Sequence, residues 1–250
     1  MKAFKYGLYC GLIFLCLLSQ AGASETARKF INGVTAYQEG DFQAAIDAFS
    51  ALYASGIENA ELFYNLGNAY LKNDDLGHAI LWYERALKRE PADPDVKFNL
   101  DYALSLTKDQ KAETALPLSH IFFFWKYQLS AAAVQCAAII LNLVFWSLLG
   151  VSLFWRNKKL QRIAYLTLVF ALLFTSTAWF NYYESAYRPP AVILPPEAAI
   201  RSGLSDDATE LFVLHAGTKV RIEKERNAHV RIYFADGKIG WIKKDLVGRI

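Results

Sequence analysis

The chain has 250 residues, enough for one or two modest domains. Hydrophobic residues make up 54% of it and charged residues 20%, which is high for a purely soluble protein and low for a polytopic transporter. The formal net charge of +3 is too small to favour nucleic acid as a partner, and apart from one short loop the basic residues form no stripe. We therefore expect soluble modules joined by a few membrane spans.

The first 23 residues have the three parts of a secretory signal peptide. Lys2 and Lys5 supply a charged beginning, an apolar run covers residues 6–18, and the small residues Ala21-Gly22-Ala23 follow. We predict that residues 1–23 form a signal peptide that exports the segment after it. An uncleaved membrane anchor is the alternative.

From residue 24 onward the pattern is helical and repeats with a period of 34. Equivalent residues recur at this spacing: Gly33 with Gly67, Phe42 with Leu76, Ala45 with Ala79, and Phe49 with Tyr83. A 34-residue unit of two helices is typical of tetratricopeptide (TPR) repeats. The second unit resembles the TPR consensus at its signature positions, which are Phe63, Leu66, Gly67, Tyr70, Ala79, Tyr83, Ala86 and Pro91. Gly67 and Ala79 are expected where the paired helices cross closely, with Tyr70 and Tyr83 filling the space between them.

We assign residues 24–108 to an α-helical TPR domain of about two repeats and a capping helix. A third unit starts near Pro94 but lacks its second helix, so its first helix is expected to cover the apolar end of the array. TPR arrays usually bind a peptide or a partner helix in the groove lined by their first helices. The resemblance therefore implies a set of candidate partner-binding residues, namely Tyr64, Asn68, Leu71, Phe98 and Tyr102. The alternative is that these residues only complete the fold.

Two long apolar stretches follow a linker and interfacial aromatic segment over residues 109–128. We predict transmembrane helices at residues 129–155 and 163–183, because about 20 apolar residues cross the hydrocarbon layer. The loop between them, residues 156–162, carries basic side chains and no acidic one, which keeps such a loop in the cytoplasm. We expect a bacterial inner (cytoplasmic) membrane protein whose soluble domains lie on the periplasmic or external side.

Three uncharged polar residues interrupt the first of these spans: Gln135, Asn142 and Ser147. They either make contacts between the two helices or are simply tolerated, because an uncharged amide costs far less in a membrane than a charge does. Neither span carries a charge at mid-membrane, which argues against a transport path.

Residues 189–250 have the alternating pattern of short β-strands. Apolar and polar residues alternate in "TKVRIEKE" and "HVRIYFA", and after the turn residues Asp236 and Gly237 the next strand begins with "KIGWIKK". We predict a small all-β barrel, and these pieces resemble a bacterial SH3-like domain. Gly240 and Trp241 are its most specific positions. Trp241 either anchors the barrel, with Gly240 avoiding a clash beside it, or helps to form a ligand groove.

The order of these parts resembles the BatE family of the bacterial aerotolerance (Bat) operon. The members of this family are multidomain membrane proteins. The segments "KFNLDYAL" at residues 97–104 and "PLSHIFFFWKYQLS" at residues 117–130 strengthen the resemblance. It implies work in envelope stress or aerotolerance, beside membrane proteins with von Willebrand A domains and a MoxR-type ATPase. The resemblance implies no particular biochemical activity.

Two functions are open from the sequence. The first is a membrane-anchored scaffold or adaptor that binds protein partners through exported TPR and SH3-like domains. The second is a cell-wall anchor or sensor that binds peptidoglycan, since SH3-like tails of exported bacterial proteins often do so. The lipid bilayer is a partner in both cases, and nucleic acid is a partner in neither.

We do not expect an enzyme, and we assign no catalytic, metal-binding or cofactor-binding residue. The sequence has no G-x-S-x-G, H-E-x-x-H or P-loop signature and no paired-carboxylate signature. Cys10, Cys16 and Cys136 lie in apolar runs without disulfide or metal-ligand spacing. The four histidines are scattered, whereas a zinc site needs ligands gathered on one surface.

Overall fold

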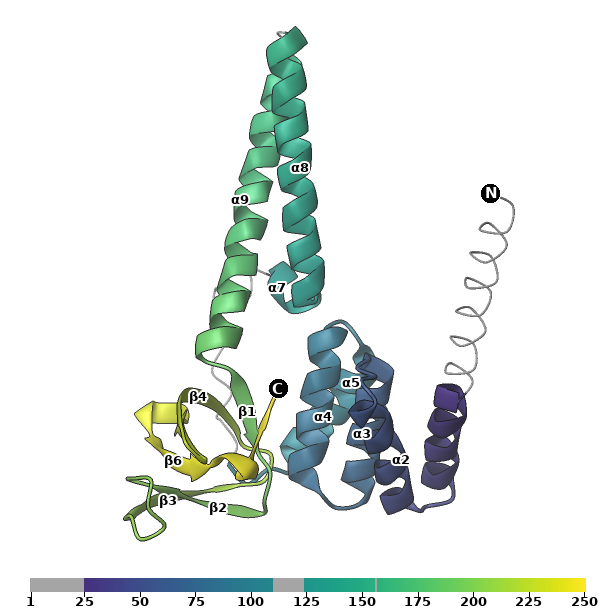
Figure 1. Ribbon diagram of the computed structural model, residues 1–250, viewed down its shortest axis with the longest axis vertical. Coiled ribbons are helices and arrows are strands. Elements are labelled where there is room, and N and C mark those ends of the chain that lie inside the picture. Colours follow the sequence, from purple (N-terminus) through teal and green to yellow (C-terminus); the bar gives the residue numbers. More distant parts are fainter. Residues whose placement is uncertain (1–24, 110–123, 156) are drawn as a thin grey trace, which may run out of the picture.

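The computed structural model of the protein describes residues 25–109, 124–155 and 157–250 (Figure 1). The predicted signal peptide, most of the predicted linker and Arg156 lie outside the described residues. The described chain forms three parts: a helical region, a long two-helix hairpin and an antiparallel sheet. Figure 1 shows the helical region and the sheet beside each other at the same end of the hairpin.

The helical region contains a helix at residues 25–38, followed by α2 (Phe42–Ala54), α3 (Ala60–Lys72), α4 (Leu76–Arg89) and α5 (Pro94–Ser105). Each of α2 to α5 starts directly after a residue whose side-chain oxygen accepts a hydrogen bond from a backbone N–H of the first turn: Asp41, Asn59, Asp75 and Asp93. These caps satisfy donors that have no partner within the helix, and so fix where each helix begins. Pro94 follows its cap at the first helical position, where proline is well tolerated.

The 34-residue period corresponds to a repeated helix crossing. A Cβ atom on Gly67 would lie 2.5 Å from the ring of Tyr83, and a Cβ atom on Gly33 would lie 2.6 Å from the ring of Phe49. Only glycine lets the first helix of each pair approach the aromatic ring of the second helix so closely. The position equivalent to Gly67 in α5 is Asp101, which is exposed because no second helix follows α5 within residues 25–109.

The hairpin consists of α8 (Ala131–Trp155) and α9 (Lys158–Tyr187), and the short helix α7 (Phe124–Gln128) precedes it. Both long helices are long and apolar enough to cross a membrane. Helix α9 is longer than the predicted span at residues 163–183. Asn157 caps it, so the basic residues Lys158 and Lys159 belong to its first turn instead of a free loop.

Apart from Phe145, the buried residues of the hairpin are small or medium-sized: Val134, Ala138, Phe145 and Ser152 on α8, and Ala164, Ala171 and Thr177 on α9. Large apolar side chains cover the outer surface of the hairpin. Asn142 donates a hydrogen bond across it, from Nδ2 to Oγ1 of Thr175 at 3.0 Å. Of the two alternatives for this polar residue, the geometry therefore favours a helix–helix contact, whereas Gln135 and Ser147 are exposed.

The region after α9 is an antiparallel sheet of β1 (Pro190–Ile193), β2 (Glu197–Arg201), β3 (Glu210–His215), β4 (Lys219–Arg226), β5 (His229–Tyr233), β6 (Ile239–Lys243) and β7 (Val247–Arg249). The strand order is β3-β2-β6-β5-β4-β1-β7. The prediction of an all-β C-terminal region is thus confirmed. The strands β3 and β7 are the edges, so the hydrogen-bonded pairing does not close into the predicted barrel.

Strand β1 is buried on both faces because it joins the sheet to the helical region. Ala191 and Ile193 belong to the core of the sheet, whereas Val192 belongs to the core of the helical region and Leu194 packs against it. The approach is close enough that a Cβ atom on Gly77 of α4 would lie 2.2 Å from the carbonyl oxygen of Leu194. The helical region and the sheet therefore form one packed body, called the TPR–sheet unit below (residues 25–109 and 190–250).

Polar contacts surround this apolar junction. Asp109 accepts hydrogen bonds from the backbone N–H of His215 at 2.6 Å and from the hydroxyl of Thr218 at 2.8 Å, and its other oxygen lies 3.0 Å from Nδ1 of His215. Burial raises the pKa of Asp109, but these hydrogen bonds outweigh it and hold the pKa below its ordinary value. Lys219 of β4 also forms an ion pair with Glu84 of α4.

The glycine crossing gives a prediction about stability. Gly67→Leu places a branched side chain into the ring of Tyr83 and should lower the free energy of unfolding of the full chain in detergent by about 1–3 kcal/mol or more. Thermal melting followed by circular dichroism measures this change. Gly150→Leu is the matched control, because Gly150 is a helical glycine with open space around it. Equal melting temperatures of the two variants would contradict the crossing.

The junction gives a prediction about pH. Because the pKa of Asp109 is lowered by folding, its contribution to stability is present above the ordinary value of 3.8 and is lost as the pH falls through the folded pKa. Asp109→Asn should therefore lower the melting temperature at neutral pH, and the difference from the natural chain should shrink at acidic pH. The exposed Asp101→Asn serves as the control. If the difference in melting temperature between Asp109→Asn and the natural chain stays constant from neutral to acidic pH, folding does not lower the pKa of Asp109.

Candidate interaction surfaces

The five predicted groove residues come from α3 and α5, which lie beside each other. Tyr64, Asn68 and Leu71 on α3 are half-buried. Phe98 and Tyr102 on α5 are exposed, by 75% and 55% respectively. Only the two aromatic residues of α5 therefore offer most of their side chains to a partner.

A hydrogen-bonded network holds this face together. The side-chain oxygen of Asn68 accepts from the hydroxyl of Tyr83 at 2.7 Å and from Nδ2 of Asn99 at 2.9 Å. The same nitrogen of Asn99 lies 3.1 Å from the hydroxyl oxygen of Tyr64. Burial, together with the neighbouring Tyr64 and Tyr37, raises the pKa of Tyr83. Tyr83 therefore stays a neutral donor, and α3, α4 and α5 are tied together directly beneath the exposed aromatic residues.

Asn99 is a residue of this network that sequence analysis missed as a functional position. The 34-residue period makes it equivalent to Asn65, but the side chain of Asn65 donates to the carbonyl oxygen of Glu61 within its own helix. Only the spatial approach of α5 to α3 gives Asn99 its role. The exposed stripe on α5 also extends one turn beyond Tyr102 to Leu106, which is 50% exposed.

On the sheet, Gly240 and Trp241 have different surroundings. Gly240 is buried, and a Cβ atom there would lie 2.4 Å from Cγ2 of Ile200, so glycine permits the close packing of β6 on β2. Trp241 is half-buried and stands outside the buried core cluster of the sheet. It pairs in register with Arg201 of β2 and Arg231 of β5, one on each side.

The two arginines beside Trp241 are held in place by other groups. Arg231 lies 3.2 Å from a carboxylate oxygen of Glu223, and Arg201 donates from Nη1 to the carbonyl oxygen of Ala208 at 2.9 Å. An indole between two guanidinium groups can contact a flat or anionic ligand. The same indole also covers this part of the sheet, since Trp241 is half-buried.

Among residues 25–109, 124–155 and 157–250, no group of three or more His, Cys, Asp or Glu side chains could hold a metal ion. A cavity of about 640 Å³ at the start of α4 contains two histidines, His78 and His215. His78 contacts the capping residue Asp75 at 2.8 Å, and His215 contacts Asp109, so both histidines belong to structural contacts.

Comparison with known proteins identifies part of the chain. Residues 32–95 match the tetratricopeptide repeat family, which confirms the repeat prediction for the segment from the first helix to the start of α5. No curated protein matches the chain. TPR repeats are typically non-catalytic modules that bind other proteins, so the match supports a protein–protein interaction role.

Proposed function

We propose that the protein is a membrane-anchored, non-enzymatic scaffold that binds protein partners through its TPR face. The observation that carries this proposal is the exposure of Phe98 and Tyr102 above the network of Tyr64, Asn68 and Asn99. Aromatic side chains on a rigid support are favourable anchors for a partner, because little conformational entropy is lost when they become buried. The match to the TPR family supports the same role.

The membrane anchor is the hairpin α8–α9, in an inner membrane of a bacterium. Its outer surface is covered by apolar side chains, and the basic residues Lys158, Lys159 and Arg162 gather at the end remote from the TPR–sheet unit. Basic residues at helix ends stay in the cytoplasm, so the TPR–sheet unit would lie on the periplasmic side. The signal peptide predicted at residues 1–23 is part of the same proposal.

The finer assignments follow from the resemblance to the BatE family. In that case the domains would be a TPR domain at residues 24–108, spans at 129–155 and 163–183, and an SH3-like domain at 189–250. The partners would be membrane proteins with von Willebrand A domains, in a Bat-type complex that also involves a MoxR-type ATPase. The short antiparallel strands and the close contact at Gly240 support an SH3-like fold for the last domain.

Crosslinking in cells tests the partner-binding face. A photocrosslinking residue at the exposed Asp95, one turn before Phe98, should capture a membrane protein with a von Willebrand A domain. The double variant Phe98→Ser/Tyr102→Ser should reduce this capture by about tenfold or more, as expected when aromatic anchors are removed.

Two exposed apolar residues of the sheet supply the matched control. The variant Leu211→Ser/Ile239→Ser makes the same kind of change outside the TPR face and should leave the capture unchanged. Comparable melting curves of both variants show that the fold is kept. If the double variant of α5 captures the same partner as well as the natural chain does, this face is not the binding surface.

A second candidate function, cell-wall binding, is favoured by the position of Trp241 between Arg201 and Arg231. An aromatic ring flanked by cations suits the sugar faces and carboxylates of peptidoglycan.

If this function holds, the full chain in detergent should be retained on purified cell-wall sacculi, and Trp241→Ala should reduce retention several-fold. Ile239→Ala, two residues earlier on the same face of β6, is the control. Flow-through of the natural chain would exclude this function.

A further inference from the structure

A second cavity, of about 480 Å³, lies where the TPR–sheet unit meets the hairpin. Its walls come from the last turns of α4, from the end of β7 and residue 250, and from residues 130–132 at the start of α8. Tyr53, Glu58 and Phe63 of the helical region complete the lining. The cationic side chains in these walls are Arg85, Lys88, Arg89 and Arg249. The size falls within the range of small-ligand pockets in proteins.

The cations outnumber the acidic groups around this cavity. Arg89 pairs with Glu58, and Arg249 pairs with Glu225. Among the described residues, neither Arg85 nor Lys88 forms an ion pair within 4 Å with a carboxylate side chain, although Glu58 also attracts Arg85 at longer range. Lys88 donates to the main-chain oxygen of Ile250 at 2.9 Å. Even if a carboxylate at Ile250 is counted as a third anion, four cations face three anions.

The excess charge is held in a fixed place. The guanidinium group of Arg85 lies over the ring of Trp82, 4.6 Å from its centroid, and donates to the main-chain oxygen of Arg249 at 2.8 Å and 3.0 Å. Partial burial, with the like charges of Arg89 and Arg85 nearby, lowers the pKa of Lys88. Like charges crowded in this way repel one another, and an anion bound among them would relieve that repulsion.

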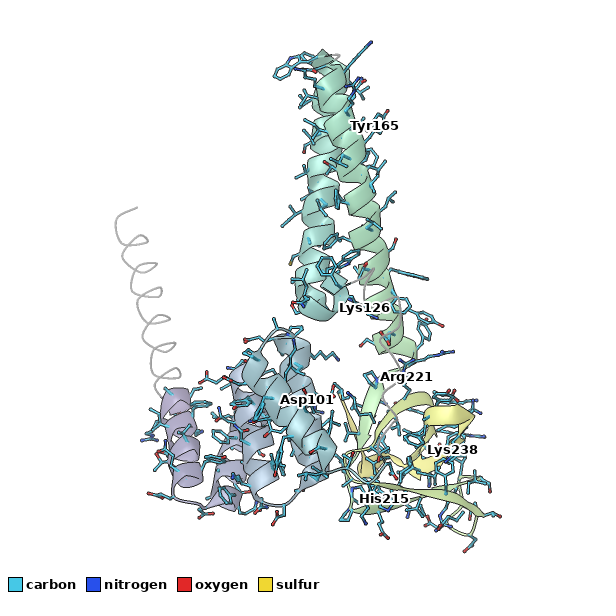
Figure 2. The ribbon with its side chains drawn as sticks, turned by 180° about the vertical axis from the view of Figure 1, so that it is seen from behind. Asp101, Lys126, Tyr165, His215, Arg221 and Lys238 are labelled. Atoms are coloured by element: carbon cyan, nitrogen blue, oxygen red, sulfur yellow. The ribbon has the colours of Figure 1, made fainter. Side chains whose placement is uncertain are left out.

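The location of the cavity indicates the source of the anion. Figure 2 shows Lys126 at the end of the hairpin that faces the TPR–sheet unit and Tyr165 toward the opposite end. Residues 130–132 of the cavity wall lie at this same near end, where α8 begins. If α8 crosses a bilayer, its first turn lies at the level of the lipid headgroups. The hydroxyl of Ser130 already accepts a hydrogen bond from the backbone N–H of Ala133, and the positive end of the α8 dipole adds further attraction for an anion.

We propose that this cavity binds the phosphate headgroup of an anionic phospholipid, from the leaflet on the side of the TPR–sheet unit. The proposal rests on the proposed membrane anchor. Arginine and lysine side chains recognise the phosphate oxygens, and the acyl chains run beside the apolar surface of α8. A bound lipid then links the end of α4 to the start of α8, which are otherwise separated in sequence by residues 90–130.

Lipid retention tests the proposal with the full chain. The protein is inserted into nanodiscs of phosphatidylcholine mixed with phosphatidylglycerol, released into mild detergent, and examined by native mass spectrometry for bound lipid. The natural chain should retain phosphatidylglycerol in preference to phosphatidylcholine. Lys88→Gln/Arg89→Gln should weaken this retention by about 25-fold, because each of the two basic residues near a membrane surface contributes roughly a factor of five.

Two further variants separate this site from a general charge effect. Lys72→Gln/Lys108→Gln removes two positive charges near the other end of α4 and should retain the lipid as the natural chain does. Lys88→Arg keeps the charge and should also keep the lipid. Melting curves of all variants show whether the TPR–sheet unit stays folded, and inorganic phosphate is added as a competitor for the same cavity.

The remaining outcomes either overturn the lipid site alone or overturn the membrane anchor as well. Equal retention by Lys88→Gln/Arg89→Gln and the natural chain would overturn the site. Displacement of the lipid by an equimolar amount of inorganic phosphate would also overturn it, because a lipid whose acyl chains add contacts should bind more tightly than the free ion. A natural chain that inserts into nanodiscs but retains both lipids equally would overturn this inference and leave the membrane anchor intact. A chain that does not insert at all would overturn the anchor and the lipid site together.

Discussion

The burial of β1 on both faces is the interaction on which the rest of the structure depends. This strand of four residues places Ala191 and Ile193 in one hydrophobic core and Val192 in another. Exposing it would open both cores at once, and every apolar residue transferred back to water would add to the free-energy loss. Because β1 also follows α9 with only two residues between them, the orientation of the hairpin is linked to the same contact.

The packed junction fixes the distance and orientation between the two candidate binding surfaces of the TPR–sheet unit. One surface is formed by the exposed aromatic residues of α5, and the other by Trp241 of the sheet with Arg201 and Arg231 beside it. Both lie on parts that pack together at α4, so a partner that contacts both surfaces meets them at a fixed separation. A flexible connection would let each surface bind independently and would add an entropic penalty for simultaneous binding. Under the proposed scaffold function, the fixed arrangement would favour one partner, or two neighbours held at a defined distance.

The sequence predicted features that depend on residues close together in the chain or on a regular period. Gly67 and Tyr83 were identified because their spacing recurs at Gly33 and Phe49, and the strands of the sheet because their side chains alternate. The junction was missed because Gly77 meets Leu194 across more than a hundred residues, and no periodic pattern joins them. A local signal existed in "AVIL" at residues 191–194, where an unbroken apolar run in a short strand indicates burial on both faces. The role of Asn99 was missed for a related reason, since its equivalent in the repeat bonds within its own helix.

Helix α4 shows how these constraints combine in one element. One side carries Tyr83 into the crossing with α3, and a second side presents Gly77 and Leu81 to the sheet. Its last turn turns Lys88 and Arg89 toward the start of α8. In an ordinary TPR array the outer side of such a helix faces solvent, so any polar residue is acceptable there. Here a bulky residue at position 77 would push the sheet away from α4, because it would meet the backbone of Leu194. Lys88 and Arg89 at the other end are exposed and make polar contacts within the fold. Function and stability therefore place different demands on adjacent turns of the same helix.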